Sequence, residues 1–235
     1  LISLILLVAW MNEVVAVFDF FLGIAIYYLS FRAIIIYFSK IILTKKNLQW
    51  LLNRFHLFLL IHCLIFIAML AYIDFDFFYT PGDWDQYHAD ATMFSNYLKG
   101  LGPFKPMIKD AIAYSSLIGL IYYLFSDSIF LAVFINVFFV VVSSILLYLL
   151  MEELFDYYVA KLSLYISAFY PILFINEISL WKECFIYFLF TLGSLVTYRT
   201  LRYGRKNDII TTIIVYIGLY NVRFFLILPF LLYIL

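Results

Sequence analysis

Long uninterrupted apolar runs constrain this chain more than any other feature of its sequence. They occur at about 1–10, 14–38, 56–73, 111–126, 128–150, 160–176, 184–201, 209–221 and 224–235. A helix needs about 20 apolar residues to cross the roughly 30 Å of hydrocarbon in a bilayer. The runs are continuous and do not alternate with period two, as the strands of a membrane β-barrel do. The sequence therefore predicts an all-α fold, a polytopic bundle of transmembrane helices.

The composition of the chain supports a membrane location and excludes a basic surface. Of its 235 residues, 67% are hydrophobic and 13% are charged, whereas soluble domains have about 45–50% apolar and about 25% charged residues. Fifteen basic and fifteen acidic residues give a formal net charge of zero. Because nucleic-acid binding depends on an excess of positive charge, nucleic acid is not an expected partner. Membrane lipids are the expected partners of the apolar helices.

The charged connections predict an orientation. The connection between two early runs contains four cations and no acid: Lys40, Lys45, Lys46 and Arg54. A second basic cluster follows residue 198 and consists of Arg199, Arg202, Arg205 and Lys206. The positive-inside rule places both groups in the cytoplasm. The segment 74–110 holds six Asp and three Lys. It is therefore the expected external loop, and the segment 177–183 is a second external connection.

The number of crossings must be even between the two basic clusters. Five runs lie between residues 56 and 201, so one of them must not cross. The run 111–126 spans only about 24 Å as a helix, and it contains Ser115, Ser116 and Gly119. We therefore expect it to be an interfacial helix on the external side. Whether 209–235 forms one helix or two stays open.

The external loop contains the first candidate functional residues. Pro81-Gly82 ends any preceding structure, and Asp83, Tyr87 and Asp90 follow at i, i+4 and i+7, on one face of an amphipathic helix. Asp83 followed by Gln86 is equally a helix-capping pattern. Asp83 and Asp85 together can supply hard oxygen ligands for a divalent cation, which stays open as a cofactor. His88 is expected to be exposed.

Three further charged residues lie where the chain meets the membrane. Lys105, between Phe104 and Pro106, is either a phosphate ligand or a lysine that extends its ammonium to water. Glu183 opens an apolar run, where a carboxylate also favours a helix N-terminus. Arg223 lies between apolar residues, and a cation there needs an anionic partner.

The order of these residues resembles the GT-C superfamily of polytopic glycosyltransferases, especially the branch of protein O-mannosyltransferases and the lipid A aminoarabinose transferase. The resemblance covers about residues 56–235 and rests on short motifs in sequence: Gly82-Asp83 with Tyr87 and Ala91, Phe104-Lys105-Pro106, Leu124-Phe125, Pro171 within a helix, Glu183, and Asn221-Val-Arg223. The chain departs from that family in having Glu183 where Asp is frequent, and in having extra helices before residue 56. We therefore expect extra transmembrane helices and a basic connection in 1–55, and a catalytic module in 56–235 that is incomplete at its C-terminus.

The resemblance implies a function. It implies transfer of a sugar from a polyprenyl-phosphate donor to a lipid, glycan or protein acceptor, with inversion, on the external or periplasmic face of the plasma membrane. Asp83 and Glu183 would be the catalytic carboxylates, and Lys105 and Arg223 would bind the donor phosphate. Asp85 and Tyr87 would support them.

Two other functions stay open from the sequence. One is an O-antigen-type polymerase or ligase, and the other is a transporter or flippase without enzymatic activity. A transporter would be expected to carry paired intramembrane charges or duplicated halves with broken helices.

Overall fold

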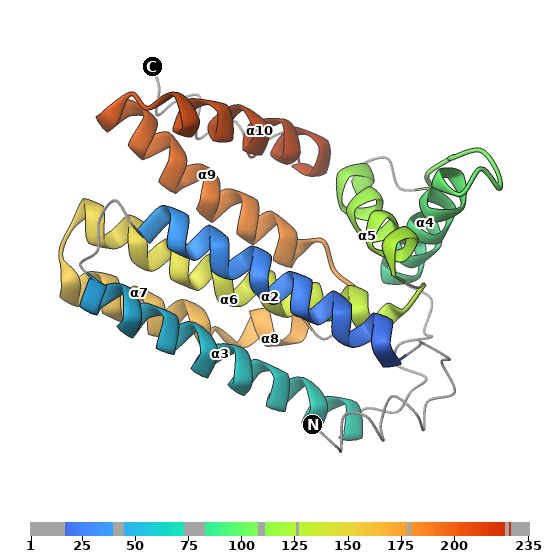
Figure 1. Cartoon of the computed structure of the whole chain (residues 1–235), viewed down its shortest axis with the longest axis horizontal. Helices are drawn as coiled ribbons and strands as arrows, with labels where there is room; N and C mark the ends of the chain where they lie inside the picture. Colours follow the sequence, from blue (N-terminus) through green and yellow to red (C-terminus); the bar gives the residue numbers. More distant parts are fainter. Residues whose placement is uncertain are drawn as a thin grey trace.

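All regular structure that a computed structural model describes for this chain is helical (Figure 1). The description covers residues 17–39, 45–72, 83–107, 111–125, 127–177, 180–223 and 226. The helices are α2 (Val17–Ser39), α3 (Lys45–Tyr72), α4 (Asp83–Leu98), α5 (Ile112–Leu124), α6 (Ile129–Leu154), α7 (Tyr157–Ala168), α8 (Pro171–Glu177), α9 (Glu183–Tyr203) and α10 (Lys206–Arg223).

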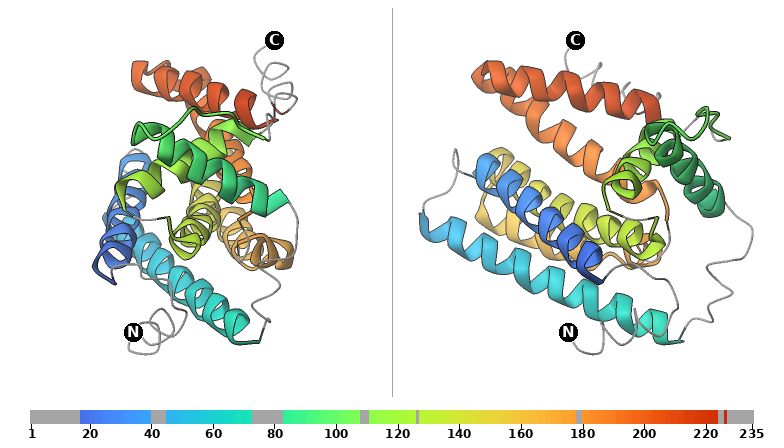
Figure 2. Two further views of the ribbon diagram at one scale, coloured as in Figure 1. Left: turned by 90° about the vertical axis from the view of Figure 1, so that its right-hand side faces the viewer. Right: turned by 45° about the vertical axis from the view of Figure 1, so that its right-hand side comes forward.

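The bundle is built around α6. In the most apolar 18-residue window within Phe130–Leu154, 94% of the residues are buried inside the molecule, a far larger share than in the other long helices that the structure describes. Helices α2, α3, α7 with α8, and α9 pack lengthwise around it, and α10 runs along α9 (Figure 2). Aromatic side chains fill the contacts, as where Phe31 stacks on Phe138 at 5.4 Å between ring centroids. Close packing of this kind holds the helices in fixed positions.

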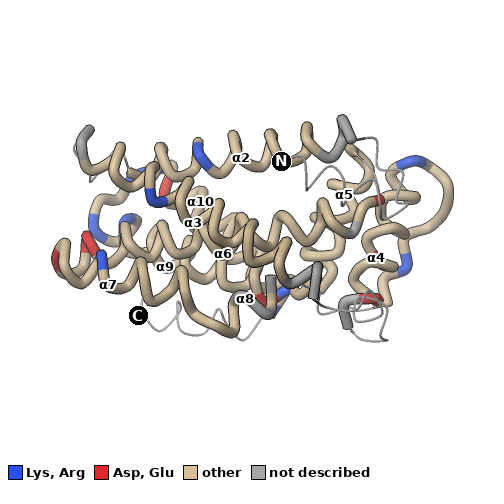
Figure 3. The backbone as a smooth tube through the Cα atoms, turned by 90° about the horizontal axis from the view of Figure 1, so that it is seen from below, with Lys and Arg blue, Asp and Glu red and all other residues tan. Residues whose placement is uncertain are grey.

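Helices α4 and α5 lie together at one end of the bundle, which we call the α4 end (Figure 1). Here α3 and α10 end and α6 and α9 begin. At the opposite end α2, α6 and α9 end, and α3, α7 and α10 begin. Charged residues gather towards the two ends, and the stretch between them is largely uncharged (Figure 3).

Among the residues that the structure describes, four helices are long and apolar enough to cross a membrane. They are Phe21–Ser39, Asn47–Ala68, Phe130–Leu154 and Glu183–Tyr203. Together with the entirely helical architecture they make this chain an integral membrane protein, as the sequence predicts. Helix α5 is too short to belong to this set.

The placement of α5 agrees with the charge-parity argument. Instead of running along the bundle, α5 packs against α4 and touches the end of α10 (Figure 2). The chain around residue 54 and the chain around residue 199 consequently lie at the same end of the bundle, opposite α4. Both basic clusters were predicted to share one side.

The run 160–176 forms two helices, which corrects the expectation of one helix that carries Pro171. Helix α7 ends at Ala168 and α8 starts at Pro171. Proline has no N–H and disfavours helical geometry in the residue before it, so it suits the first turn of a new helix. His62 of α3 donates a ring N–H to the Ala168 carbonyl oxygen at 2.9 Å, which satisfies an end group of α7 inside the bundle.

Helix α3 starts at Lys45, earlier than the apolar run that begins at residue 56. The expected division after residue 55 therefore falls within α3. Polar side chains in its first turns support helical geometry: Gln49 donates to Asn53 at 3.0 Å, and the Arg54 guanidinium lies 5.4 Å from the ring of Trp50. Such amphipathic residues extend a membrane helix into the interface.

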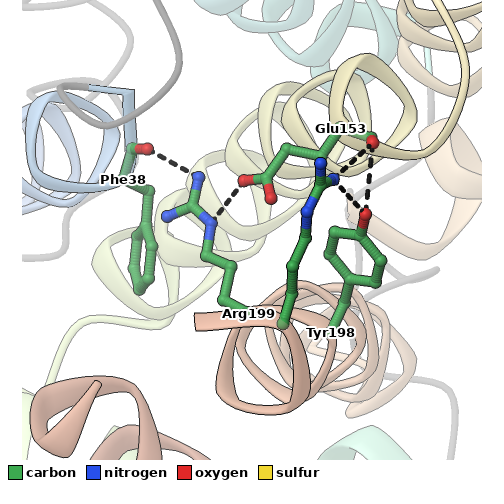
Figure 4. A network of polar contacts seen from close by, with 5 residues as sticks. Phe38, Glu153, Tyr198 and Arg199 are labelled. Carbon is green, nitrogen blue, oxygen red and sulfur yellow. Dashed lines mark hydrogen bonds and ion pairs between the residues drawn. The ribbon is translucent and has the colours of Figure 1, made fainter. Parts of the chain in front are cut away.

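A buried ion pair joins three helices at the opposite end (Figure 4). Arg199 of α9 donates to Glu153 of α6 at 2.6 Å and to the Phe38 carbonyl oxygen of α2 at 2.8 Å. Tyr198 adds a bond to the Glu153 carbonyl oxygen at 3.3 Å. Arg199 is fully buried, so the expectation that this member of the basic cluster lies in a water-facing connection is wrong. Its counter-ion is Glu153 of α6.

Candidate functional site

Helix α4 forms one wall of the candidate site and packs tightly on α5. Tyr87, Asp90 and Ala91 are all buried, so the face that the sequence predicts is the face that packs inwards. Gly119 of α5 permits this contact, because a Cβ there would lie only 2.5 Å from the Ala91 carbonyl oxygen. Asp83 is the first residue of α4. Its side chain lies outside the described part of the structure.

Asp90 fixes the segment that carries Lys105. The Asp90 carboxylate accepts a hydrogen bond from the Met107 backbone N–H at 2.8 Å, and Phe104 packs edge-on against Phe94 of α4 at 5.0 Å. A buried carboxylate that accepts a backbone N–H is a structural anchor. Lys105 itself is exposed and makes no hydrogen bond or ion pair with any described residue. Its predicted role in phosphate binding therefore stays a prediction.

Glu183 and Arg223 meet at the α4 end. The Arg223 guanidinium donates to the Glu183 carboxylate at 3.2 Å, although 40 positions separate them in the chain. Glu183 starts α9 and Arg223 ends α10, so the antiparallel packing of these helices brings the two residues together. The pair is partly exposed, with 42% of the Arg223 side chain and 30% of the Glu183 side chain accessible. Arg223 thus has the anionic partner that its apolar surroundings predict, and Glu183 orients a cation.

A second polar group lies between α4 and the start of α6. His88 shares a hydrogen bond of 2.8 Å with the Tyr122 hydroxyl of α5, and Asp85 and Asp127 lie near the ring. Burial lowers the pKa of His88, and the two nearby carboxylates partly oppose that shift. The expectation that His88 is exposed is wrong, because the ring packs against Tyr122.

The described side chains contain no group of three His, Cys, Asp or Glu that could hold a metal ion. Asp85 and Asp127 each act on the charge of His88, and the side chain of Asp83 is not part of that description. The possibility of a divalent cation at Asp83 and Asp85 is therefore untested.

Lys182 is a candidate that the sequence argument missed. It exposes only 8% of its surface, and its ammonium lies 5.9 Å from the centre of the Tyr87 ring. A cation–π contact at that distance contributes only on the order of 1 kcal/mol, and lysine is rarely this buried unless it is paired. The sequence feature that could have indicated Lys182 is Trp181-Lys182 immediately before an apolar run. That pair is equally typical of residues that flank a membrane helix at the membrane–water interface.

A chain of buried polar contacts fixes the backbone beside Lys182. The Tyr114 hydroxyl of α5 donates to the Asn136 side-chain oxygen at 3.1 Å, and the Asn136 side-chain N–H donates to the Trp181 carbonyl oxygen at 3.3 Å. The Tyr114 ring in turn packs edge-on against Tyr87 at 5.6 Å. Helices α4, α5, α6 and α9 therefore meet around Tyr87 and Lys182.

Comparisons with protein-family models, with curated proteins and with solved structures give no match for this chain. The fold and the site define its class: a helical integral membrane protein with a glutamate–arginine ion pair, a histidine–tyrosine contact and a largely buried lysine at one end of the bundle.

Proposed function

We propose that this chain is a membrane glycosyltransferase that moves a sugar from a polyprenyl-phosphate donor to an acceptor on the external face, with inversion. One observation carries the proposal. The Glu183–Arg223 ion pair stands at the same end of the bundle as α4, the helix that begins with Asp83. A transferase of this kind needs a carboxylate and a cation together, at the level where a lipid-linked donor meets water.

The proposed reaction is a single displacement at the anomeric carbon. Asp83 accepts the proton of the acceptor hydroxyl or amine as that group attacks. The bond between the anomeric carbon and the acceptor atom forms while the bond to the phosphate oxygen breaks, so the configuration inverts. The electron pair leaves with the lipid phosphate, and Arg223 and Lys105 stabilise its negative charge. Arginine suits this role because its planar fork can donate two parallel hydrogen bonds to phosphate oxygens.

Three other residues support this arrangement. Glu183 holds the Arg223 guanidinium in one orientation, so that it is in place before charge develops on the phosphate. Tyr87 lies one helical turn after Asp83, and Asp85 lies between them in sequence. Acceptors can be lipid, glycan or protein, and the surrounding lipids are permanent partners of the apolar helices.

The experiment is a transfer assay in membranes that contain the protein, with a panel of radiolabelled hexose and pentose donors on polyprenyl phosphate. Asp83→Asn should abolish transfer at normal expression. Lys105→Ala should lower turnover several-fold, and Lys105→Arg should lower it less. Lys99→Ala is the matched control, because Lys99 is another exposed lysine, just after the end of α4, and among the described residues its ion-pair partner is Asp127, at 3.7 Å.

Full activity of Asp83→Asn would remove the proposed base. The products separate the proposal from a transporter or flippase, which would move the donor lipid with its sugar–phosphate bond intact. Release of polyprenyl phosphate in proportion to sugar transfer is the result that we expect.

A further inference from the structure

Lys182 is a largely buried residue whose ammonium has no anionic partner among the described residues. Its ammonium makes no hydrogen bond or ion pair with any residue that the structure describes, and its one contact of note is the Tyr87 ring at 5.9 Å. That distance is near the outer limit of about 6 Å for a cation–π contact. Lysine is almost never this buried unless it is paired.

The position of Lys182 in α9 makes the excess of positive charge larger. Lys182 is the N-cap residue of α9 and provides no side-chain hydrogen bond to the helix. The first N–H groups of a helix point outwards and give that end a partial positive charge, so a cation is the wrong residue for this place unless an anion joins it. Glu183 follows in the first turn, but its carboxylate is engaged by Arg223.

From these contacts we infer that Lys182 binds a phosphate group at the start of α9, beneath α4. The inference deepens the proposed function, on which its lipid-linked ligand rests. A helix N-terminus together with a cation is a recurrent phosphate site, because backbone N–H groups and the ammonium can donate to different oxygens of the same group. A phosphate carries more oxygens and more charge than a carboxylate, so it satisfies this set of donors better.

The surrounding structure holds the site in place before any ligand arrives. Asn136 binds the Trp181 carbonyl oxygen at 3.3 Å, and Leu180 and Cys184 on either side of the site are fully buried. The backbone at Lys182 is therefore fixed, which lowers the entropy that ligand binding must overcome. Tyr87, under which the ammonium lies, is one helical turn after Asp83. A phosphate on Lys182 would lie close to the turn of α4 that carries the proposed base.

The test is a binding assay on the whole chain purified in detergent. Radiolabelled farnesyl phosphate represents the lipid-linked ligand, inorganic phosphate represents a free ion, and farnesol is the uncharged control. Lys182→Met keeps the length of the side chain and removes its charge. We expect it to weaken farnesyl phosphate binding by at least about tenfold, as the loss of a charge-assisted hydrogen bond predicts. Lys182→Arg should retain most of the affinity.

Lys161→Met is the matched control. The Lys161 ammonium also lies 5.9 Å from a tyrosine ring, that of Tyr157, but Lys161 is exposed and lies in α7, towards the opposite end of the bundle. Its replacement should leave binding unchanged. If Lys182→Met cannot be purified as a folded protein, Lys182→Gln takes its place with the same expected loss.

The outcomes separate this inference from the proposed function. Farnesyl phosphate binding that is the same in wild type and in Lys182→Met overturns the inference, and sugar transfer by the wild type would then still uphold the function. Lys182-dependent binding without transfer from any donor upholds the phosphate site and contradicts the transferase. Lys182-dependent binding of inorganic phosphate but not of farnesyl phosphate upholds the phosphate site and contradicts a lipid source. Absence of binding in every arm overturns the inference.

Discussion

The contact of α4 with α5 makes Gly119→Ala a demanding test of the packing that positions Asp83. A Cβ at Gly119 would lie 2.5 Å from the Ala91 carbonyl oxygen and 2.8 Å from the Phe94 Cβ. Ordinary contacts at such atoms are above 3.4 Å, so the two helices must separate by roughly 1 Å. The obstructing atom belongs to the backbone of α4, and no change of side-chain rotamer removes it.

The expected magnitude follows from two opposing effects. Overpacking costs about 1–3 kcal/mol, and alanine in place of glycine within a helix gains about 1 kcal/mol. Gly119→Ala should therefore lower the free energy of unfolding by about 1 kcal/mol, since the first effect exceeds the second. Gly218→Ala in α10 is the matched control, because a Cβ there meets only the end of the Leu189 side chain, at 3.2 Å. It should be neutral or stabilising.

The assay is thermal unfolding in detergent, followed with a thiol-reactive dye. Cys184 is fully buried beside the site and reacts when the packing opens, and Cys63→Ser in every variant removes the second thiol. A change of 1 kcal/mol shifts the Tm of a chain of this size by about 2–4 °C. Gly119→Ala should fall below the parent by about that amount, and transfer activity should fall with it. A Gly119→Ala protein that is as stable as Gly218→Ala would refute the close contact.

Two further predictions concern buried charge. Glu153→Gln leaves Arg199 buried without its counter-ion, which costs about 3–5 kcal/mol, so the Tm should drop by on the order of 10 °C. The double variant Glu153→Leu/Arg199→Met removes both charges and should recover most of that loss. A double variant with a Tm as low as that of Glu153→Gln would contradict this explanation. The lowered pKa of His88 favours the neutral ring in the folded protein, so this stabilisation is present above the ordinary pKa of about 6.5 and is lost as the pH falls towards the lower folded-state pKa. The Tm should therefore decline between about pH 7 and pH 5, and His88→Gln should remove that decline.

Much of the fold could be predicted from hydrophobicity and charge. Apolar runs mark the crossing helices because the bilayer requires their length, and the parity of the basic clusters singled out the short run that became α5. The break between α7 and α8 before Pro171 is explained by the chemistry of proline. It was not predicted, because the apolar run 160–176 continues across it. The early start of α3 was missed because its polar residues resemble a connection, whereas they form the interfacial turns of a helix.

The two buried cations show what the sequence argument could not supply. Arg199 extends the buried stripe of Phe188, Leu192 and Leu195 at helical spacing, so the helical period indicates burial. Because Arg199 is charged, its side chain was instead expected to be exposed to water. Lys182 carries no such signal, because its burial comes from tertiary contacts such as that with Tyr87 of α4. The partners of a charge come from tertiary contacts, and a sequence read by itself specifies only the charge.

The candidate site was predicted in part. The sequence singled out Glu183 and Arg223 separately, and the pairing of α9 with α10 brings them together. Tyr87 was expected on the face of Asp83 and lies on the packed face of α4. The roles of Asp83 and Lys105 stay predictions, since they depend on a ligand and an acceptor.

The central claim is that the α4 end faces the external compartment, and cysteine labelling in whole cells tests it most directly. Gly102 is exposed and has open space for a side chain, and Arg205 is an exposed position at the opposite end. A membrane-impermeant maleimide should label Gly102→Cys in intact cells, and it should label Arg205→Cys only after permeabilisation. Labelling of Arg205→Cys in intact cells while Gly102→Cys stays protected would contradict the account.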